Sequence, residues 1–387
     1  MRILMLTPYM KMGYGVAEAV ANLATNLSAI GIQTAVGCLE YDKYFSGLSV
    51  RRVSPDPLSV LDAAARARAT TVVAHGSPYF EILPALTGKV RTVAYEYGDP
   101  TPEMFAQDAA ERRQIADLKK VNVYPHVDAV ATISEFIRHD IDWPAADVVR
   151  LGIEHVPDLG PKPLVPPQRS DEPLRIGTLM RLGSGEARYK GHSHLLEIKK
   201  QVSQVCPGAR FEIMGRGNPD DALGFEAAGF HVHLNATVEE RSDFLRTVDV
   251  FVSPSQWEGT NLPLVEAAAL GTPALAFDTG SHPEFTPLIF SRTEQIVQQI
   301  AAYDVDRTGL LRDHGAMCYH YVRCGMSWHE AAREFGAVVS GRRRVAPSRP
   351  LGARVRQRID QFRSEISDNG WQSASQKTYQ TARGRFR

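Results

Sequence analysis

Short apolar runs alternate with helix-like segments in the first half of the chain. Each run has the length of a buried strand, and the spacing of Val16, Val20 and Leu23 after the first run is that of one helix face. The runs are Ile3–Leu6, Thr34–Cys38, Thr71–Ala74, Thr92–Tyr95, Ala129–Ile133 and Val148–Leu151. Because strands that alternate with helices form parallel sheets covered by helices, this half predicts one α/β domain.

A proline-rich segment divides the pattern. Residues 157–173 read PDLGPKPLVPPQRSDEP and hold six prolines, a composition typical of a linker. The alternation then resumes, and a last helix is predicted at 327–339. The apolar runs of this second half are 174–180, Arg210–Met214, His231–Leu234, Val248–Ser253 and Ala274–Phe277. The sequence therefore predicts a first domain at 1–160, a linker at 161–173 and a second domain at 174–340.

Residues 341–387 differ from the rest of the chain in charge. They carry 12 arginines and lysines against three acidic residues, whereas the whole chain has no net charge. Five apolar residues are spaced as one helix face, which predicts a basic amphipathic helix followed by a disordered polar end. They are Leu351, Val355, Ile359, Phe362 and Ile366. Such a tail packs on its own acidic body, contacts an anionic membrane or binds nucleic acid; the last is disfavoured because aromatic residues are not interleaved with the basic ones.

The composition excludes several classes of protein. Hydrophobic residues make up 43% and charged residues 23%, which is typical of a globular chain. No apolar run reaches the roughly 18 residues of a membrane-spanning helix, and the first run is too short for a signal peptide. The four cysteines lack metal-ligand spacing, so we expect free thiols and no structural zinc. We expect a cytoplasmic protein, peripheral at the inner face of the membrane if the tail binds lipid.

The segment EGTNLPLVE places Glu258 and Glu266 eight positions apart across a predicted helix start. Asn261 is a good N-cap residue and Pro263 is tolerated in the first turn, so Glu266 lies early in the helix and leans back toward its N-terminus. The free backbone N–H groups of that turn favour anions. Two carboxylates beside an anion site suit the hydroxyls of a ligand whose phosphates are neutralised elsewhere, as in a nucleotide sugar. Spacing alone, however, favours two solvated charges at a helix edge.

Basic residues follow the first strand of the same half. The segment MRLGSGEARYKG (180–191) places Arg181 after the strand and Lys190 at the end of the loop, before Gly191. Either side chain can grip a diphosphate, the arginine as a fork and the lysine as a point charge.

Together these segments resemble the retaining glycosyltransferases of family 4, which have the GT-B fold. Glu258 and Glu266 match the E-x7-E element within SPSQWEGTNLPLVEAAALGTPALAFDTGSHPE, and FEIMGRG matches a strand that ends in Gly-x-Gly. Arg181, Lys190 and Gly191 match the basic element. The likeness also reaches the first half, through MRILMLTPYMKMGYGVAEAVANLATNL and VDAVATISEFIR. It implies an α/β GT-B chain in which two doubly wound, Rossmann-like domains face each other across a cleft.

The resemblance implies a role for each matched position. Arg181 and Lys190 would hold the donor diphosphate, and Glu258 would bind hydroxyls of the donor sugar at the catalytic centre. Glu266 would bind the ribose. The other donor-binding positions are Gly13, Gly15, Gly215, Gly259, Thr260, Asn261 and Leu262. No metal or other cofactor is implied, because the basic residues neutralise the diphosphate; the donor is a nucleotide-diphosphate hexose, with a UDP-sugar favoured.

Two features depart from the family pattern. The loop from Arg181 to Lys190 is longer than usual, so Arg188 competes with Lys190 for the phosphate role. The histidine that many members carry near residue 95 is absent from AYEYGDP, which leaves His75, Glu96 and Asp99 as candidates on the acceptor side.

We therefore expect the second domain to bind the donor and the first to present an unidentified acceptor for a retaining transfer. Two alternatives stay open. A nucleotide-sugar epimerase would use Glu96, Asp99 and His75 as acids and bases and would need no acceptor. A catalytically weak nucleotide-sugar-binding protein would bind the donor without turnover.

Overall fold

The computed structural model describes residues 1–105, 108–162 and 172–342. These residues lie in one compact unit, Met1–Arg343. Most of the predicted linker and nearly all of the basic tail, including the predicted helix at 351–366, lie outside the described residues. None of the helices in the described ranges combines the length and the apolar character that a bilayer span requires.

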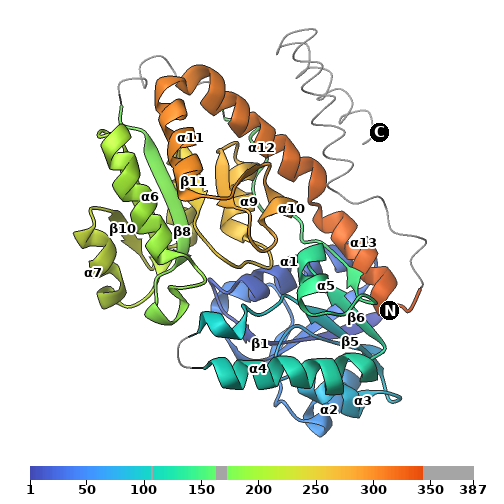
Figure 1. Cartoon of the computed structure of the whole chain (residues 1–387). Coiled ribbons are helices and arrows are strands. Elements are labelled where there is room, and N and C mark those ends of the chain that lie inside the picture. Colours follow the sequence, from blue (N-terminus) through green and yellow to red (C-terminus); the bar gives the residue numbers. More distant parts are fainter. Residues whose placement is uncertain (106–107, 163–171, 343–387) are drawn as a thin grey trace. The chain divides into compact units, whose positions relative to one another are not determined.

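Within the described residues, the first half forms a parallel sheet of seven strands in the order β3-β2-β1-β4-β5-β6-β7 (Figure 1). The strands are β1 (Arg2–Met10), β2 (Gln33–Tyr41), β3 (Val50–Arg52), β4 (Thr71–Ala74), β5 (Arg91–Glu96), β6 (Ala129–Thr132) and β7 (Asp147–Val148). Strand order reverses between β1 and β4, the place where doubly wound sheets open a crevice for ligands.

The described part of the second half forms a parallel sheet of six strands in the order β10-β9-β8-β11-β12-β13. The strands are β8 (Arg175–Arg181), β9 (Arg210–Arg216), β10 (His231–Leu234), β11 (Val250–Ser253), β12 (Ala274–Phe277) and β13 (Leu288–Phe290). Here the order reverses between β8 and β11. The prediction of two doubly wound parallel α/β sheets is thus confirmed.

Helices flank both sheets. In the first half they are α1 (Gly15–Ala29), α2 (Pro57–Ala67), α3 (Leu83–Leu86), α4 (Ala109–Leu118) and α5 (Glu135–Asp140). In the second half they are α6 (His192–Val205), α7 (Pro219–Ala227), α8 (Val238–Thr247), α9 (Leu262–Ala269), α10 (His282–Phe285), α11 (Thr293–Val305), α12 (Arg312–Gly325) and α13 (Trp328–Val339). The predicted face of α1 is buried, with Val20 and Leu23 in the core.

The last described helix, α13, packs on the first half of the chain, against β6 and α1 (Figure 1). The ring of Phe335 stacks on that of Tyr95, with centroids 5.0 Å apart. At its end the carbonyl of Val339 accepts a hydrogen bond from the Thr71 hydroxyl at 3.2 Å. The chain therefore returns to its first half after completing the second, and the boundaries at 160, 174 and 340 stay predictions.

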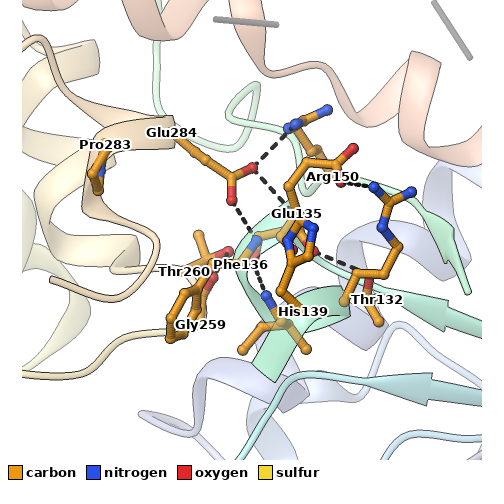
Figure 2. A network of polar contacts seen from close by, with 12 residues as sticks. Thr132, Glu135, Phe136, His139, Arg150, Gly259, Thr260, Pro283 and Glu284 are labelled. Atoms are coloured by element: carbon orange, nitrogen blue, oxygen red, sulfur yellow. Dashed lines mark hydrogen bonds and ion pairs between the residues drawn. The ribbon is translucent and has the colours of Figure 1, made fainter. Parts of the chain in front are cut away.

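The short helix α10 binds the first half through Glu284 (Figure 2). The carboxylate of Glu284 accepts the backbone N–H groups of Glu135 and Phe136 at 3.1 and 2.8 Å, at the N-terminus of α5. It also accepts a bond from Arg150 at 3.0 Å. An anion at a helix N-terminus satisfies N–H groups that have no partner within the helix, so this contact holds α10 and α5 together. We call Glu284 with its three partners the α10–α5 clamp.

We expect Glu284→Ala to lower the thermal unfolding temperature, because the substitution leaves two helix N–H groups and Arg150 without their shared acceptor. The loss of stability should be about 2 kcal/mol, in the range for hydrogen bonds to a charged group. The control is Glu294→Ala, which removes an exposed carboxylate from the first turn of α11. Equal unfolding temperatures for the two variants would show that the clamp does not stabilise the fold.

Candidate functional site

A cavity of about 590 Å³ is lined by the carboxyl-terminal ends of both sheets. From the second sheet come the ends of β8 and β9 and the loop between β11 and α9; from the first come the loop before α1 and the end of β5. The volume lies within the range of small-molecule sites. The order reversal of the second sheet therefore opens into this space, which we call the donor cavity.

The loop between β11 and α9 is held in place by Asn261. Its side-chain oxygen accepts the N–H of Leu264 at 3.3 Å, so Asn261 caps α9 as predicted. Its side-chain nitrogen donates to the Ser253 hydroxyl at 2.7 Å and lies 3.2 Å from Nε2 of His282. Burial holds the pKa of His282 below its ordinary value, so this ring is neutral and serves the loop as a hydrogen-bonding group.

Lys190 and Glu258 meet in the donor cavity. The ammonium of Lys190 lies 2.8 Å from Oε1 of Glu258, and both side chains are largely buried. The two loops are joined by the backbone as well, because the N–H of Gln256 donates to the carbonyl of Tyr189 at 2.7 Å. A cation from one loop and a carboxylate from another are thus paired beside the start of α9.

Gly259, next to Glu258, lies directly against the first half of the chain. A Cβ added there would be 2.2 Å from the carbonyl oxygen of Tyr97, so only glycine fits. Gly259, Thr260, Asn261 and Leu262 all line the donor cavity, as do Gly13, Gly15 and Gly215. These seven predicted donor-binding positions are therefore in one place.

Arg181 lines the donor cavity and pairs with Glu186 at 2.5 Å. Glu186 belongs to a short turn, Ser184–Glu186, formed by the extra residues of this loop. Arg188 is not among the residues that line the cavity; it donates to the carbonyl of Glu103 at 2.6 Å. Between the two competing bases of the loop, Lys190 is the one beside the cavity.

Glu266 is buried behind an arginine. Its carboxylate pairs with Arg241 and lies 3.2 Å from Nε2 of His155. Burial alone would raise the pKa of Glu266, but Arg241 and His155 more than offset this and hold it below its ordinary value. Arg241 lines the donor cavity whereas Glu266 does not. Glu266, the predicted ribose contact, is therefore separated from the donor cavity by Arg241.

Sequence reasoning missed Arg241 and Arg216 as cavity residues. Arg241 lies on α8 and carries no motif; only its pairing with Glu266 in the fold marks it. Arg216 lies within the Gly-x-Gly strand end, and its guanidinium packs on Gly13, where a Cβ would be 2.4 Å from Nε. Gly13 has φ +84°, so both the backbone and the neighbouring arginine require glycine there.

The three acceptor-side candidates line a second cavity of about 320 Å³ at the carboxyl ends of β1, β4 and β5. We call it the side cavity. His75 is buried, with Nδ1 3.0 Å from the Tyr97 hydroxyl, and burial lowers the pKa of His75 to about 3. Glu96 and Asp99 each lie 2.9 Å from the ammonium of Lys119.

Glu96 is further fixed by the Tyr124 hydroxyl, which donates to it at 2.6 Å. Burial opposes a charge on Lys119, but the carboxylates of Glu96 and Asp99 hold its pKa above the ordinary value. Asp99 lines both cavities, whereas His75 and Glu96 line only the side cavity. Of the three candidates, only Asp99 therefore reaches the donor cavity.

Part of the second half of the chain resembles known proteins in sequence. Residues 176–302 match the family described as glycosyl transferases group 1. Over 63 residues the chain is 40% identical to a lipopolysaccharide core biosynthesis mannosyltransferase of Rhizobium meliloti, a match that covers 16% of this chain and 17% of that relative.

Solved structures are similar over most of the chain. Sucrose-phosphate synthase from Thermosynechococcus elongatus superposes with a TM-score of 0.69 and 17% identity, covering 88% of this chain and 98% of that one. A protein from Anabaena, solved in complex with UDP and glucose, gives a TM-score of 0.70 and 14% identity, covering 88% and 100%. At these identities the likeness shows the GT-B fold. The chain thus has the GT-B fold, and residues 176–302 of its second half match the family model of the group 1 glycosyl transferases.

Proposed function

We propose that the protein is a retaining glycosyltransferase that moves a hexose from a nucleotide-diphosphate sugar to an acceptor on the side of the first sheet. The observation that carries the proposal is the Lys190–Glu258 pair at the start of α9, inside a cavity that both sheets line. A cation for phosphate and a carboxylate for hydroxyls suit the two halves of a nucleotide sugar.

Lys190 and Arg181 would bind the diphosphate of the donor. An ammonium has three N–H donors, so Lys190 can keep its bond to Glu258 and still bind a phosphate oxygen. Arg181 pairs with Glu186, and its side chain is 57% exposed, so its guanidinium is accessible to a ligand from the open side. As the bond to the sugar breaks, negative charge grows on the departing nucleotide, and two fixed cations lower the energy of that state.

Glu258 would bind hydroxyls of the donor sugar, while Glu266 would bind the ribose with Arg241 as its neighbour. Arg216 and Arg241 add positive charge to the same cavity. Retention of configuration follows from the family resemblance. The Anabaena protein of the same fold was solved with UDP and glucose, which favours a UDP-sugar as donor here.

The epimerase alternative depends on His75, Glu96 and Asp99 acting as acids and bases. Glu96 already has two partners, and His75 does not line the donor cavity. These positions favour a role of the side cavity other than proton transfer at the donor sugar.

We expect Lys190→Ala to lower the rate of UDP release from the preferred UDP-sugar by about 100-fold or more, the usual loss on removing a group that stabilises transition-state charge. The matched control is Arg188→Ala, because Arg188 is a base of the same loop outside the donor cavity. It should keep the wild-type rate within about twofold. If both variants lose activity equally, the effect belongs to the fold of the loop and the phosphate role of Lys190 is wrong.

A calorimetric titration with UDP tests the ribose role of Glu266. We expect Glu266→Gln to weaken UDP binding about tenfold, near the lower end for a lost hydrogen bond to a charged group, because the amide oxygen still accepts a bond. The control is Glu212→Gln, a buried carboxylate whose partners Arg175 and His233 do not line the donor cavity, whereas Arg241, the partner of Glu266, does. Unchanged UDP affinity in Glu266→Gln would remove Glu266 from the donor site.

The neutral state of His75 has a consequence for stability. Because its pKa is about 3 in the folded chain and about 6.5 when unfolded, only the unfolded chain gains a proton as the pH falls below 6.5, so folding is weakened. Between pH 7 and 5 the wild type should lose about 2 kcal/mol more stability than His75→Gln. Thermal unfolding of both at the two pH values measures this difference; parallel losses would show that His75 is accessible to protons when folded.

A further inference from the structure

The side cavity lies at the order reversal of the first sheet. Leu6 of β1 pairs in register with Ala74 of β4, so Thr7 and His75 follow as neighbours at the carboxyl ends of the two strands. The N–H of His75 donates to the carbonyl of Leu6 at 2.8 Å, which fixes this neighbourhood. Ligands of doubly wound sheets bind at such a reversal.

Two buried polar atoms of this cavity have no partner among the described residues. They are the hydroxyl oxygen of Thr7 and Nε2 of His75, on side chains that are 1% and 2% exposed. A buried polar group without a hydrogen bond is costly, so two of them in one cavity lining point to a ligand that supplies the missing bonds.

The chemistry of these atoms favours hydroxyl groups as partners. The Thr7 hydroxyl both donates and accepts. Nε2 of His75 donates in one tautomer and accepts in the other, depending on which way the bond between Nδ1 and Tyr97 runs. A ligand hydroxyl satisfies either tautomer, whereas a phosphate oxygen or an ammonium group satisfies only one.

The charges of the side cavity disfavour an anion. Among its lining residues Glu96 and Asp99 are acidic and Arg112 is basic. Arg112 is within 3.8 Å of Asp108 and lies 3.6 Å over the ring of Phe105. The donor cavity differs in having several bases, since Arg181, Lys190, Arg216 and Arg241 line it as well as Arg112, together with five acidic residues.

Aromatic rings supply the remaining contact surface. Tyr9 and Tyr14 line the side cavity with their rings 5.2 Å apart, and both are partly exposed. Phe80, in a short helical turn after β4, and Tyr97, directly after β5, line it as well. Aromatic faces with a few polar groups fit the apolar faces and hydroxyls of a sugar ring.

We propose that the side cavity binds the acceptor and takes an uncharged sugar residue, whose hydroxyls bond to Thr7 and His75. The inference rests on the proposed transferase function. It adds the substrate class: a neutral glycan end or glycoside, and not a sugar phosphate. Tyr97, Gly98 and Asp99 line both cavities, so an acceptor bound here is next to the donor.

The test measures UDP release from the preferred UDP-sugar with and without acceptor probes. The probes are methyl glycosides of glucose, galactose, mannose and N-acetylglucosamine, their disaccharides, and the 6-phosphates of the same sugars. We expect a neutral glycoside to stimulate UDP release at least fivefold, while its 6-phosphate does not.

The variant that tests the site is Thr7→Val, which removes the hydroxyl and keeps the shape. We expect it to raise the KM of the neutral acceptor about fivefold, as for one neutral hydrogen bond, with unchanged UDP affinity. Its unfolding temperature should stay the same or rise, because the lost hydroxyl has no partner in the free protein. The control, Thr71→Val on the neighbouring strand, should lower the unfolding temperature and leave the acceptor KM unchanged, because the Thr71 hydroxyl binds Val339.

The outcomes separate the two proposals. If UDP binds but sugar phosphates are the better acceptors, or no neutral probe stimulates UDP release, the assignment of the side cavity is wrong while the donor site stands. The same holds if Thr7→Val leaves the acceptor KM unchanged. If neither UDP nor any UDP-sugar binds, the proposed function fails and this inference fails with it.

Discussion

The short helix α10 is the element on which the geometry of the site depends. Its Glu284 binds the N-terminus of α5 in the first half, and the N–H of Ser281 just before it donates to the carbonyl of Glu258 at 3.0 Å. One helix thus fixes both the approach of the two halves and the backbone of a site carboxylate. Gly259 then lies directly against the Tyr97 carbonyl, where no side chain fits.

The two cavities follow from this arrangement and differ in charge. The reversal of the second sheet opens into the donor cavity and that of the first into the side cavity. Five basic side chains line the donor cavity, whereas the side cavity has one, with Glu96 and Asp99 sharing Lys119. Under the proposed function, the diphosphate of the donor binds these bases at the second sheet and its sugar faces the first.

Much of the fold was predictable, because buried parallel strands leave continuous apolar runs. The run Ile3–Leu6 is fully buried and lies inside β1. The strands β3 and β13 were missed, since three-residue edge strands carry little pattern. The α10–α5 clamp was also missed: Glu284 contacts residues about 150 positions away, and no local pattern reports such a contact.

The candidate site, too, was predictable only in part. Asn261 as a cap and Lys190 with Glu258 in one cavity were predictable, because caps and strand ends follow local rules. The position of Arg241 in front of Glu266 was not predictable, since it depends on how α8 packs beside α9. Likewise, the missing partners of Thr7 and His75 are visible only once neighbouring strands are in place.

The central claim is that a nucleotide sugar binds between the two sheets with its diphosphate at the start of α9. A crystal structure of the protein with UDP tests this most directly. The account predicts phosphate oxygens within hydrogen-bond distance of the Lys190 ammonium and of the N–H groups at Gly259 and Thr260, with the ribose toward Glu266 and Arg241. UDP bound elsewhere, with the Lys190–Glu258 pair untouched, would contradict it.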